Sequence, residues 1–104
     1  MKMNTLIVDD VKLSRDGLSA LINTYLPEAN IIGSVPSVEE ARKILKTEQI
    51  DLLFLDIQLQ DGLSFEILDD VSLNSKVIFI TAYEKYAIEA IRKGAFDYLL
   101  KPIN

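Results

Sequence analysis

Four short apolar segments of this chain each end directly in a polar residue. The segments are 6–8, 52–55, 77–80 and 98–100, and the polar residues that follow them are Asp9 and Asp10, Asp56, Thr81, and Lys101. Short apolar runs bounded by turn residues are typical of buried strands in a parallel sheet. Because parallel strands end at the same edge, we expect these side chains to gather where open α/β sheets bind ligands. Such a set of carboxylates, hydroxyl and ammonium suits a hard divalent cation and a phosphoryl group.

Between these strands the apolar spacing predicts helices. Apolar residues recur every three or four positions over about 12–26, 37–47, 63–70 and 84–93. Strands are expected over about 4–8, 31–35, 51–56, 76–80 and 96–100, with a loop at 58–62. Regular alternation of strand and helix predicts an α/β fold, a flavodoxin-like doubly wound five-stranded parallel sheet in the order 2-1-3-4-5.

Helix ends and faces can also be predicted. Ser37 and Glu40 have the spacing of a capping box, and Gly94 has the position of a glycine that closes a helix. The first helix carries an apolar stripe made of Val11, Leu18, Leu21, Ile22 and Tyr25. The second carries one made of Val38, Ala41, Ile44 and Leu45.

Composition narrows the possible chemistry. The 104 residues suit one domain, and they include no His and no Cys, so imidazole and thiolate metal sites and Ser–His or Cys–His nucleophile pairs are excluded. Any metal site must use oxygen ligands, which favours Mg²⁺, Ca²⁺ or Mn²⁺. A net charge of −5 argues against a nucleic-acid surface on this chain. No segment has transmembrane length or the form of a signal peptide, so we expect no membrane contact and a cytoplasmic location.

Each polar strand end also has an ordinary structural interpretation. Asp9 or Asp10 can cap a helix, Asp56 can close a strand, Thr81 can bond locally, and Lys101 can be a solvated turn residue. Three carboxylates within a few ångströms, however, need a cation to remain ionised together. A carboxylate can attack phosphorus to give an acyl phosphate, but the residues alone do not choose which Asp is the nucleophile.

The motifs resemble those of a known family. Ile7-Val8-Asp9-Asp10, Leu55-Asp56-Ile57, Thr81-Ala82 and Asp97-Tyr98-Leu99-Leu100-Lys101-Pro102 are similar, in order and spacing, to the signature blocks of response-regulator receiver domains. The sequences around Phe54, Phe79 and Tyr98 resemble those of receivers that precede a LytTR-type DNA-binding domain. The resemblance covers essentially the whole chain and implies one receiver domain over 1–104.

The resemblance implies a role for each matching position. Asp56 would be the phosphoacceptor, and Mg²⁺ would be held by Asp10, Asp56 and the backbone carbonyl of Gln58, with Asp9 helping through water. Thr81 would bind the phosphoryl group and Lys101 would pair with it. Tyr98 would be the aromatic switch residue, turning inward when Thr81 moves. The side chains of Gln58 and Tyr83 would flank the path of an attacking water and tune dephosphorylation.

The chain departs from the family pattern in two places. Gln60 stands where the family usually has a Pro and Ser64 where it often has a Gly, which predicts a less restrained loop after Asp56. The sequence stops just after the fifth strand, so we expect the family's fifth helix to be missing, an apolar patch beside the first helix, and family-type dimerisation to be altered.

These observations predict a signalling receiver that takes a phosphoryl group from a sensor histidine kinase. It would control an output domain absent from this chain, through which DNA would be bound, and it could pair as a homodimer. It would not be an enzyme, beyond assisting its own phosphorylation and dephosphorylation. The alternative is a Mg²⁺-dependent aspartyl phosphotransferase or phosphatase, although the connections are short for a substrate cap. A third is an interaction module that is not phosphorylated.

Overall fold

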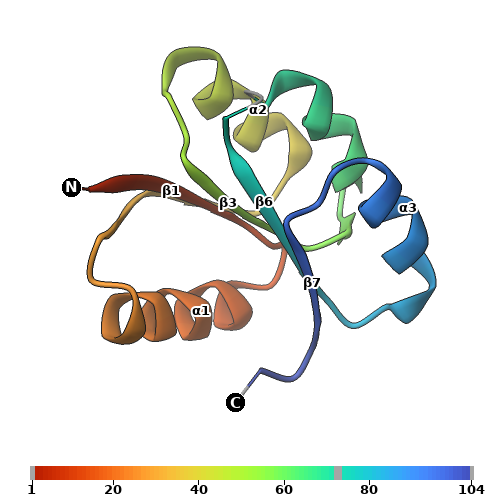
Figure 1. The fold of residues 1–104 in the computed structure, drawn as a ribbon, viewed down its shortest axis with the longest axis horizontal. Helices are drawn as coiled ribbons and strands as arrows, with labels where there is room; N and C mark the ends of the chain where they lie inside the picture. The colour runs from red at the N-terminus through yellow and green to blue at the C-terminus, as the bar shows by residue number, and fades with distance from the viewer. Residues whose placement is uncertain (1, 72–73, 104) are drawn as a thin grey trace.

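The computed structural model describes residues 2–71 and 74–103 and contains one central parallel sheet. Its strands are β1 (Met3–Val8), β2 (Ala29–Val35), β3 (Leu52–Leu55), β6 (Lys76–Thr81) and β7 (Asp97–Leu100). They lie in the order β2-β1-β3-β6-β7 (Figure 1), which confirms the predicted doubly wound order. In the described residues, no helix is long and apolar enough to cross a membrane.

Helices cover both faces of the sheet. Helix α1 (Lys12–Tyr25) lies on one face, and α2 (Val38–Thr47), the 3-10 helix η1 (Ser64–Asp70) and α3 (Ala87–Arg92) lie on the other (Figure 1). Alternate strand residues supply the two cores: Leu6, Leu53 and Phe79 face α2, η1 and α3, whereas Ile7, Phe54 and Ile80 face α1. The sheet is therefore buried on both sides, as its continuous apolar strands require.

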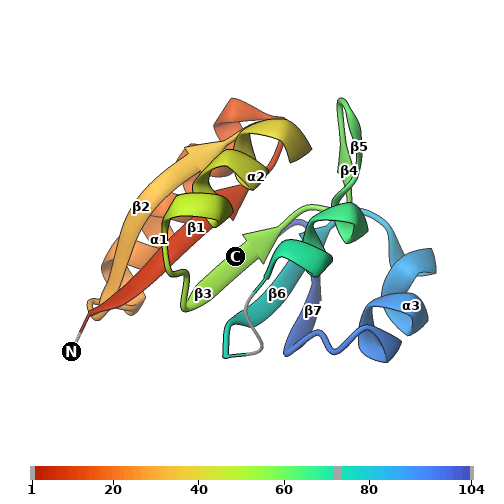
Figure 2. The same cartoon turned by 90° about the horizontal axis from the view of Figure 1, so that it is seen from above.

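The predicted loop at 58–62 is wrong in one respect, because it contains a small antiparallel hairpin. Strands β4 (Gln58–Leu59) and β5 (Gly62–Leu63) pair Gln58 with Leu63 and Leu59 with Gly62. The chain reverses at Gln60 and Asp61. Gly62, directly after this turn, has a φ of +151°, a backbone angle that side-chain-bearing residues rarely adopt. Figure 2 shows this hairpin projecting from the edge of the sheet.

Three helical predictions also need correction. The third helix is 3-10 throughout, and the fourth begins as a 3-10 turn, η2 (Glu84–Tyr86), before α3. On α1 only Ile22 is buried, and Val11 and Tyr25 are 50% and 74% exposed, so they do not belong to the core stripe. The stripe of α2 is confirmed, and Gly94 ends α3 with a positive φ of +88°.

Helix α2 begins with two caps, of which sequence reasoning found one. The Ser37 hydroxyl accepts from the Glu40 N–H at 3.2 Å, which confirms the predicted N-cap. The Glu40 carboxylate accepts from that hydroxyl at 3.4 Å and not, as a full capping box requires, from the Ser37 N–H. The Asp61 carboxylate, from the turn of the hairpin, accepts from the Val38 and Glu39 N–H groups at 2.8 and 3.1 Å. These bonds lower the pKa of Asp61 below its ordinary value of 3.8. The hairpin after Asp56 is thus tied to α2 even though Gln60 replaces the usual Pro.

Replacing Asp61 with Ala should destabilise the fold modestly. Loss of a helix cap typically costs about 1 kcal/mol, and the exposure of Asp61 places this one near the low end, about 0.5 kcal/mol. Because the folded-state pKa is depressed, the contribution is present above the ordinary pKa and is lost as the pH falls through the lower folded value. Urea unfolding at pH 7 and pH 3 checks this: a deficit that stays equal at both pH values would contradict it.

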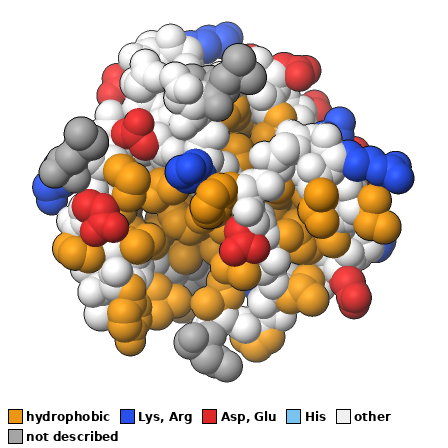
Figure 3. All heavy atoms as spheres, viewed as in Figure 1, with side chains coloured by type: hydrophobic (Ala, Val, Ile, Leu, Met, Phe, Trp, Pro, Cys, Tyr) orange, Lys and Arg blue, Asp and Glu red, His pale blue; other side chains and the backbone are white. Residues whose placement is uncertain are grey.

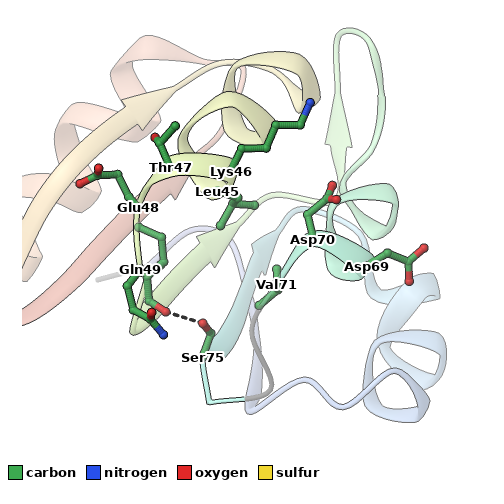
Figure 4. Close-up of a pocket in the computed structure, with 10 residues that line it drawn as sticks. Leu45, Lys46, Thr47, Glu48, Gln49, Asp69, Asp70, Val71 and Ser75 are labelled. Atoms are coloured by element: carbon green, nitrogen blue, oxygen red, sulfur yellow. Dashed lines mark hydrogen bonds between the residues drawn. The ribbon is translucent and has the colours of Figure 1, made fainter.

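Two hollows lie at opposite ends of the strands. The first, about 490 Å³, lies between α1 and the C-terminal segment and is lined by Leu13, Leu18, Leu21, Ile80, Pro102 and Ile103 beside Asp9 and Lys101. Figure 3 shows apolar side chains gathered on this face, in agreement with the expected patch. The second, about 390 Å³, lies where β3 and β6 begin (Figure 4) and contains no residue of the predicted site.

Candidate functional site

The carboxyl ends of β1 and β3 bring three carboxylates together. The two strands are neighbours, with Val8 opposite Leu55, so the residues that follow them emerge side by side. Oxygen atoms of Asp9, Asp10 and Asp56 all lie within 4.8 Å of one another. Asp9 and Asp56 are buried and Asp10 is exposed. This arrangement fulfils the expectation drawn from the strand ends.

Asp9 does not cap α1. The N-cap of α1 is Val11, which makes no side-chain capping bond. Instead, Asp9 Oδ1 accepts from the Val11 N–H at 2.9 Å, and Arg15 Nη1 donates to the Asp9 carbonyl at 2.8 Å. These contacts fix the orientation of the carboxylate and leave Oδ2 directed to the site.

Lys101 supplies the positive charge between the two buried carboxylates. Its Nζ lies 2.7 Å from Asp9 Oδ2, 3.0 Å from Asp56 Oδ2 and 3.4 Å from Ser14 Oγ. Burial alone would lower the pKa of the ammonium, but its hydrogen bonds to Asp9 and Asp56 outweigh burial and raise the pKa above 10.5. Lys101 therefore remains charged throughout the neutral range.

The backbone of β7 brings Lys101 to the edge of the sheet where the carboxylates lie. Strand β7 pairs with β6, and the Lys101 N–H donates to the Thr81 carbonyl at 2.8 Å, which extends the ladder to the edge of the sheet. The peptide bond to Pro102 is cis. A residue 45 positions from Asp56 and 92 from Asp9 is thereby brought into direct contact with both.

Thr81 lies at the same edge, but its hydroxyl makes a different contact. The side chain is fully buried, and Oγ1 accepts from the Tyr83 N–H at a long 3.4 Å. The Tyr83 carbonyl in turn accepts from the Tyr98 hydroxyl. The backbone of Tyr83 thus joins the two residues predicted to act as a switch.

Tyr98 is half-buried and packs on the core. Its ring lies 6.1 Å from that of Phe79, centroid to centroid. Burial is the main cause of the raised pKa of its phenol, so the hydroxyl remains protonated and can donate at neutral pH. The bond to the Tyr83 carbonyl fixes Tyr98 in this position.

Three contacting residues were missed by sequence reasoning. Ser14 touches Lys101, Arg15 touches the Asp9 backbone, and the Tyr86 hydroxyl accepts from Gln58 Nε2 at 2.9 Å. Ser14 and Arg15 lie in the first turn of the helix that follows the acidic pair, a position from which a first-turn residue can reach the strand end. No spacing in the sequence connects Gln58 with Tyr86.

The site residues are chemically suited to a hard divalent cation. Every potential ligand is an oxygen, and the three carboxylates come from adjacent strand ends. The charge of the ammonium is shared between Asp9 and Asp56, while the exposed Asp10 has an open side toward solvent. An acidic group with an open side and a neighbouring ammonium can hold a cation and an anionic group together.

Comparison with known proteins agrees with this geometry. The family model for the response regulator receiver domain matches residues 5–104. The chain belongs to this family. Solved receiver domains are also its structural neighbours. The response regulatory domain of protein mrkE from Klebsiella pneumoniae has a TM-score of 0.87 and 36% identity, covering 98% of this chain and 85% of that one.

Among curated proteins, the receiver is similar to sensory transduction proteins named LytT. The protein from Bacillus cereus is 40% identical over 105 residues and that from Enterococcus faecalis 39%, each alignment covering 98% of this chain. The chain spans only 42% and 43% of these two relatives. A further solved structure, the CheX-CheY-BeF3-Mg²⁺ complex from Borrelia burgdorferi, has a TM-score of 0.86 and 28% identity over 98% of this chain and 80% of that one.

Proposed function

We propose that this receiver accepts a phosphoryl group on Asp56. The observation that carries the proposal is the position of Lys101, whose ammonium lies 3.0 Å from Asp56 Oδ2 while Asp9 and Asp10 stand beside it. Asp56 Oδ1 accepts a hydrogen bond from the Ile57 N–H at 2.7 Å, and Oδ2 accepts one from the Lys101 ammonium. Among the three carboxylates, Asp56 is the one at the centre of the sheet edge, between the strands that supply Asp9 and Thr81.

Lys101, Thr81 and Tyr98 would each contact the phosphoryl group on Asp56 or respond to its arrival. Lys101 would pair with an oxygen of the phosphoryl group, and the Thr81 hydroxyl would donate to another after leaving the Tyr83 N–H. Tyr98 would respond to that movement because its hydroxyl is bound to the same residue, Tyr83. The signal would pass from the site to β7 and α3 through this connection.

Asp9, Asp10, Asp56 and the Gln58 carbonyl would hold Mg²⁺. The fit rests on the close carboxylate oxygens and on the all-oxygen donor set. When bound, Mg²⁺ would neutralise charge on the transferring group and fix its orientation. The Borrelia complex combines Mg²⁺ and BeF3 with a chain of similar fold, which supports this choice of ion.

The proposed partners follow from the family. A sensor histidine kinase would donate the phosphoryl group, and an output domain, of the LytTR type, would bind DNA in a longer protein. Residues 1–104 would act as one receiver domain, in the cytoplasm, and pair as a homodimer. We propose a stoichiometric acceptor rather than an enzyme with a separate substrate.

Titration with BeF3⁻ tests the proposal, since this anion imitates a phosphoryl group. In two-dimensional NMR with Mg²⁺, resonances of Thr81, Lys101 and Tyr98 should shift in the wild type and stay unchanged in Asp56→Ala. Mg²⁺ without BeF3⁻ provides the baseline. Shifts of the same size in Asp56→Ala would show that the anion binds without this carboxylate.

Tyr83 should lengthen the life of the phosphoryl group. Tyr83 is 40% exposed, its backbone is bonded to Thr81 and Tyr98, and its ring packs edge-on against Tyr86 with centroids 6.1 Å apart. In Tyr83→Ala the acyl phosphate should decay several-fold faster because water gains access. The decay is followed by intact-mass spectrometry after removal of the phosphodonor. Equal decay rates in the wild type and Tyr83→Ala would contradict this prediction.

A further inference from the structure

The side chain of Gln58 is held by a residue outside the carboxylate cluster. Gln58 Nε2 donates to the Tyr86 hydroxyl at 2.9 Å. Gln58 opens the hairpin two residues after Asp56, whereas Tyr86 ends η2, directly before α3. The bond therefore joins the hairpin that follows the acceptor to the start of that helix, across 28 positions of sequence.

Tyr86 is rigidly placed. Its ring packs edge-on against Phe65 and Tyr83, with centroids 6.1 Å apart in both pairs, and the Lys85 ammonium lies 5.3 Å from its centroid. Phe65 in turn packs on the buried Phe79 at 5.4 Å. Because the ring is fixed by these neighbours, the hydroxyl stays at a defined point and can hold the amide there.

In the part of the chain that the structure describes, the Gln58 amide makes one hydrogen bond, the bond to Tyr86. Ile57 and Leu59, on either side of it, are buried in the core, and Gln58 itself is only half-buried. Residues that alternate along an extended chain point to opposite sides, so Gln58 points away from the core. An amide at this place has a donor and an acceptor, and both can bind a water molecule.

We propose that Tyr86 is a positioning residue that keeps the Gln58 amide bonded to its hydroxyl and so slows the loss of the phosphoryl group. The inference rests on the proposed function of Asp56. In the loss reaction a water oxygen bonds to phosphorus as the bond from phosphorus to the Asp56 oxygen breaks. The products are the Asp56 carboxylate and inorganic phosphate, and the proton goes to the phosphate or to solvent. A Gln58 amide released from Tyr86 would orient that water.

The Tyr86→Phe variant isolates the hydroxyl, since it keeps the ring and its packing. The acyl phosphate of this variant should decay faster by about two- to tenfold, the range that one neutral hydrogen bond can shift. In the Gln58→Ala background the same change should have no effect, because Tyr86 acts only through Gln58. Tyr25→Phe, on an exposed ring of α1, is the matched control and should decay like the wild type.

A second measurement needs neither phosphate nor metal. The side-chain amide resonances of Gln58 should move to the positions of a solvent-exposed glutamine in Tyr86→Phe and stay unchanged in Tyr25→Phe. Unchanged Gln58 resonances, or equal acceleration by Tyr86→Phe with and without Gln58, would overturn the proposed role of Tyr86 while leaving phosphorylation of Asp56 intact. A wild type that takes no phosphoryl group would overturn both proposals.

Discussion

Replacing Lys101 with Met is expected to destabilise the metal-free protein by about 2 kcal/mol at pH 7. The change leaves Asp9 and Asp56 buried side by side without the ammonium that now bonds both. Removing one partner of a fully buried ion pair costs about 3–5 kcal/mol, and the 25% exposure of the Lys101 side chain reduces this figure. Urea unfolding of the two proteins in EDTA gives the difference.

The pH dependence of this deficit has a defined sign. The folded-state pKa of Lys101 is raised, so its contribution is complete below 10.5 and is lost only as the pH rises through the folded value. Lys12→Met is the control: its ion pair with Asp16 is exposed, and its loss should cost less than about 0.5 kcal/mol. Equal deficits for the two variants would contradict the account.

Addition of Mg²⁺ is expected to stabilise the wild type strongly. A ligand present at a hundred times its Kd stabilises the folded state by about 2.7 kcal/mol. For a domain of this size that corresponds to a rise in Tm of about 12 °C. Asp10→Asn should lose most of this rise, because it removes the exposed carboxylate of the cluster. Its stability without metal should not fall, since Asp10 is exposed and its replacement relieves repulsion among the three carboxylates.

The comparison requires a variant with the same loss of charge elsewhere. Asp69→Asn serves this purpose, because Asp69 is an exposed residue of η1 outside the cluster. It should respond to Mg²⁺ as the wild type does, and EDTA should reverse the rise in Tm. An equal rise in Asp10→Asn and the wild type would mean that the cation does not use this site.

The meeting of Asp9, Asp56 and Lys101 could be predicted because it follows from topology. Once the apolar runs are taken as parallel strands, their carboxyl ends must lie at one edge, whatever the loops do. The family resemblance then assigned Asp56 as the acceptor, which the residues alone did not. The structure adds the distances and shows that the ammonium is bonded to two carboxylates at once.

Contacts made by loops were beyond prediction for a physical reason. The Asp61 cap depends on how a two-residue turn meets the start of α2, and the Gln58–Tyr86 bond depends on a ring placed by Phe65. Neither pair leaves a periodic pattern, since both arise from tertiary packing. The exposed Tyr25 shows the reverse error: its spacing fits the helical stripe, but its ring at the end of α1 is open to solvent rather than packed on the sheet.

Phosphoryl transfer to Asp56 is the central claim, and intact-mass spectrometry tests it most directly. The wild type and Asp56→Ala are incubated with acetyl phosphate and Mg²⁺, with and without EDTA. The account predicts one added phosphoryl group on the wild type, lost on hydroxylamine treatment as an acyl phosphate should be, and none on Asp56→Ala or in EDTA. Equal labelling of Asp56→Ala, or a wild type that binds Mg²⁺ and remains unlabelled, would contradict it.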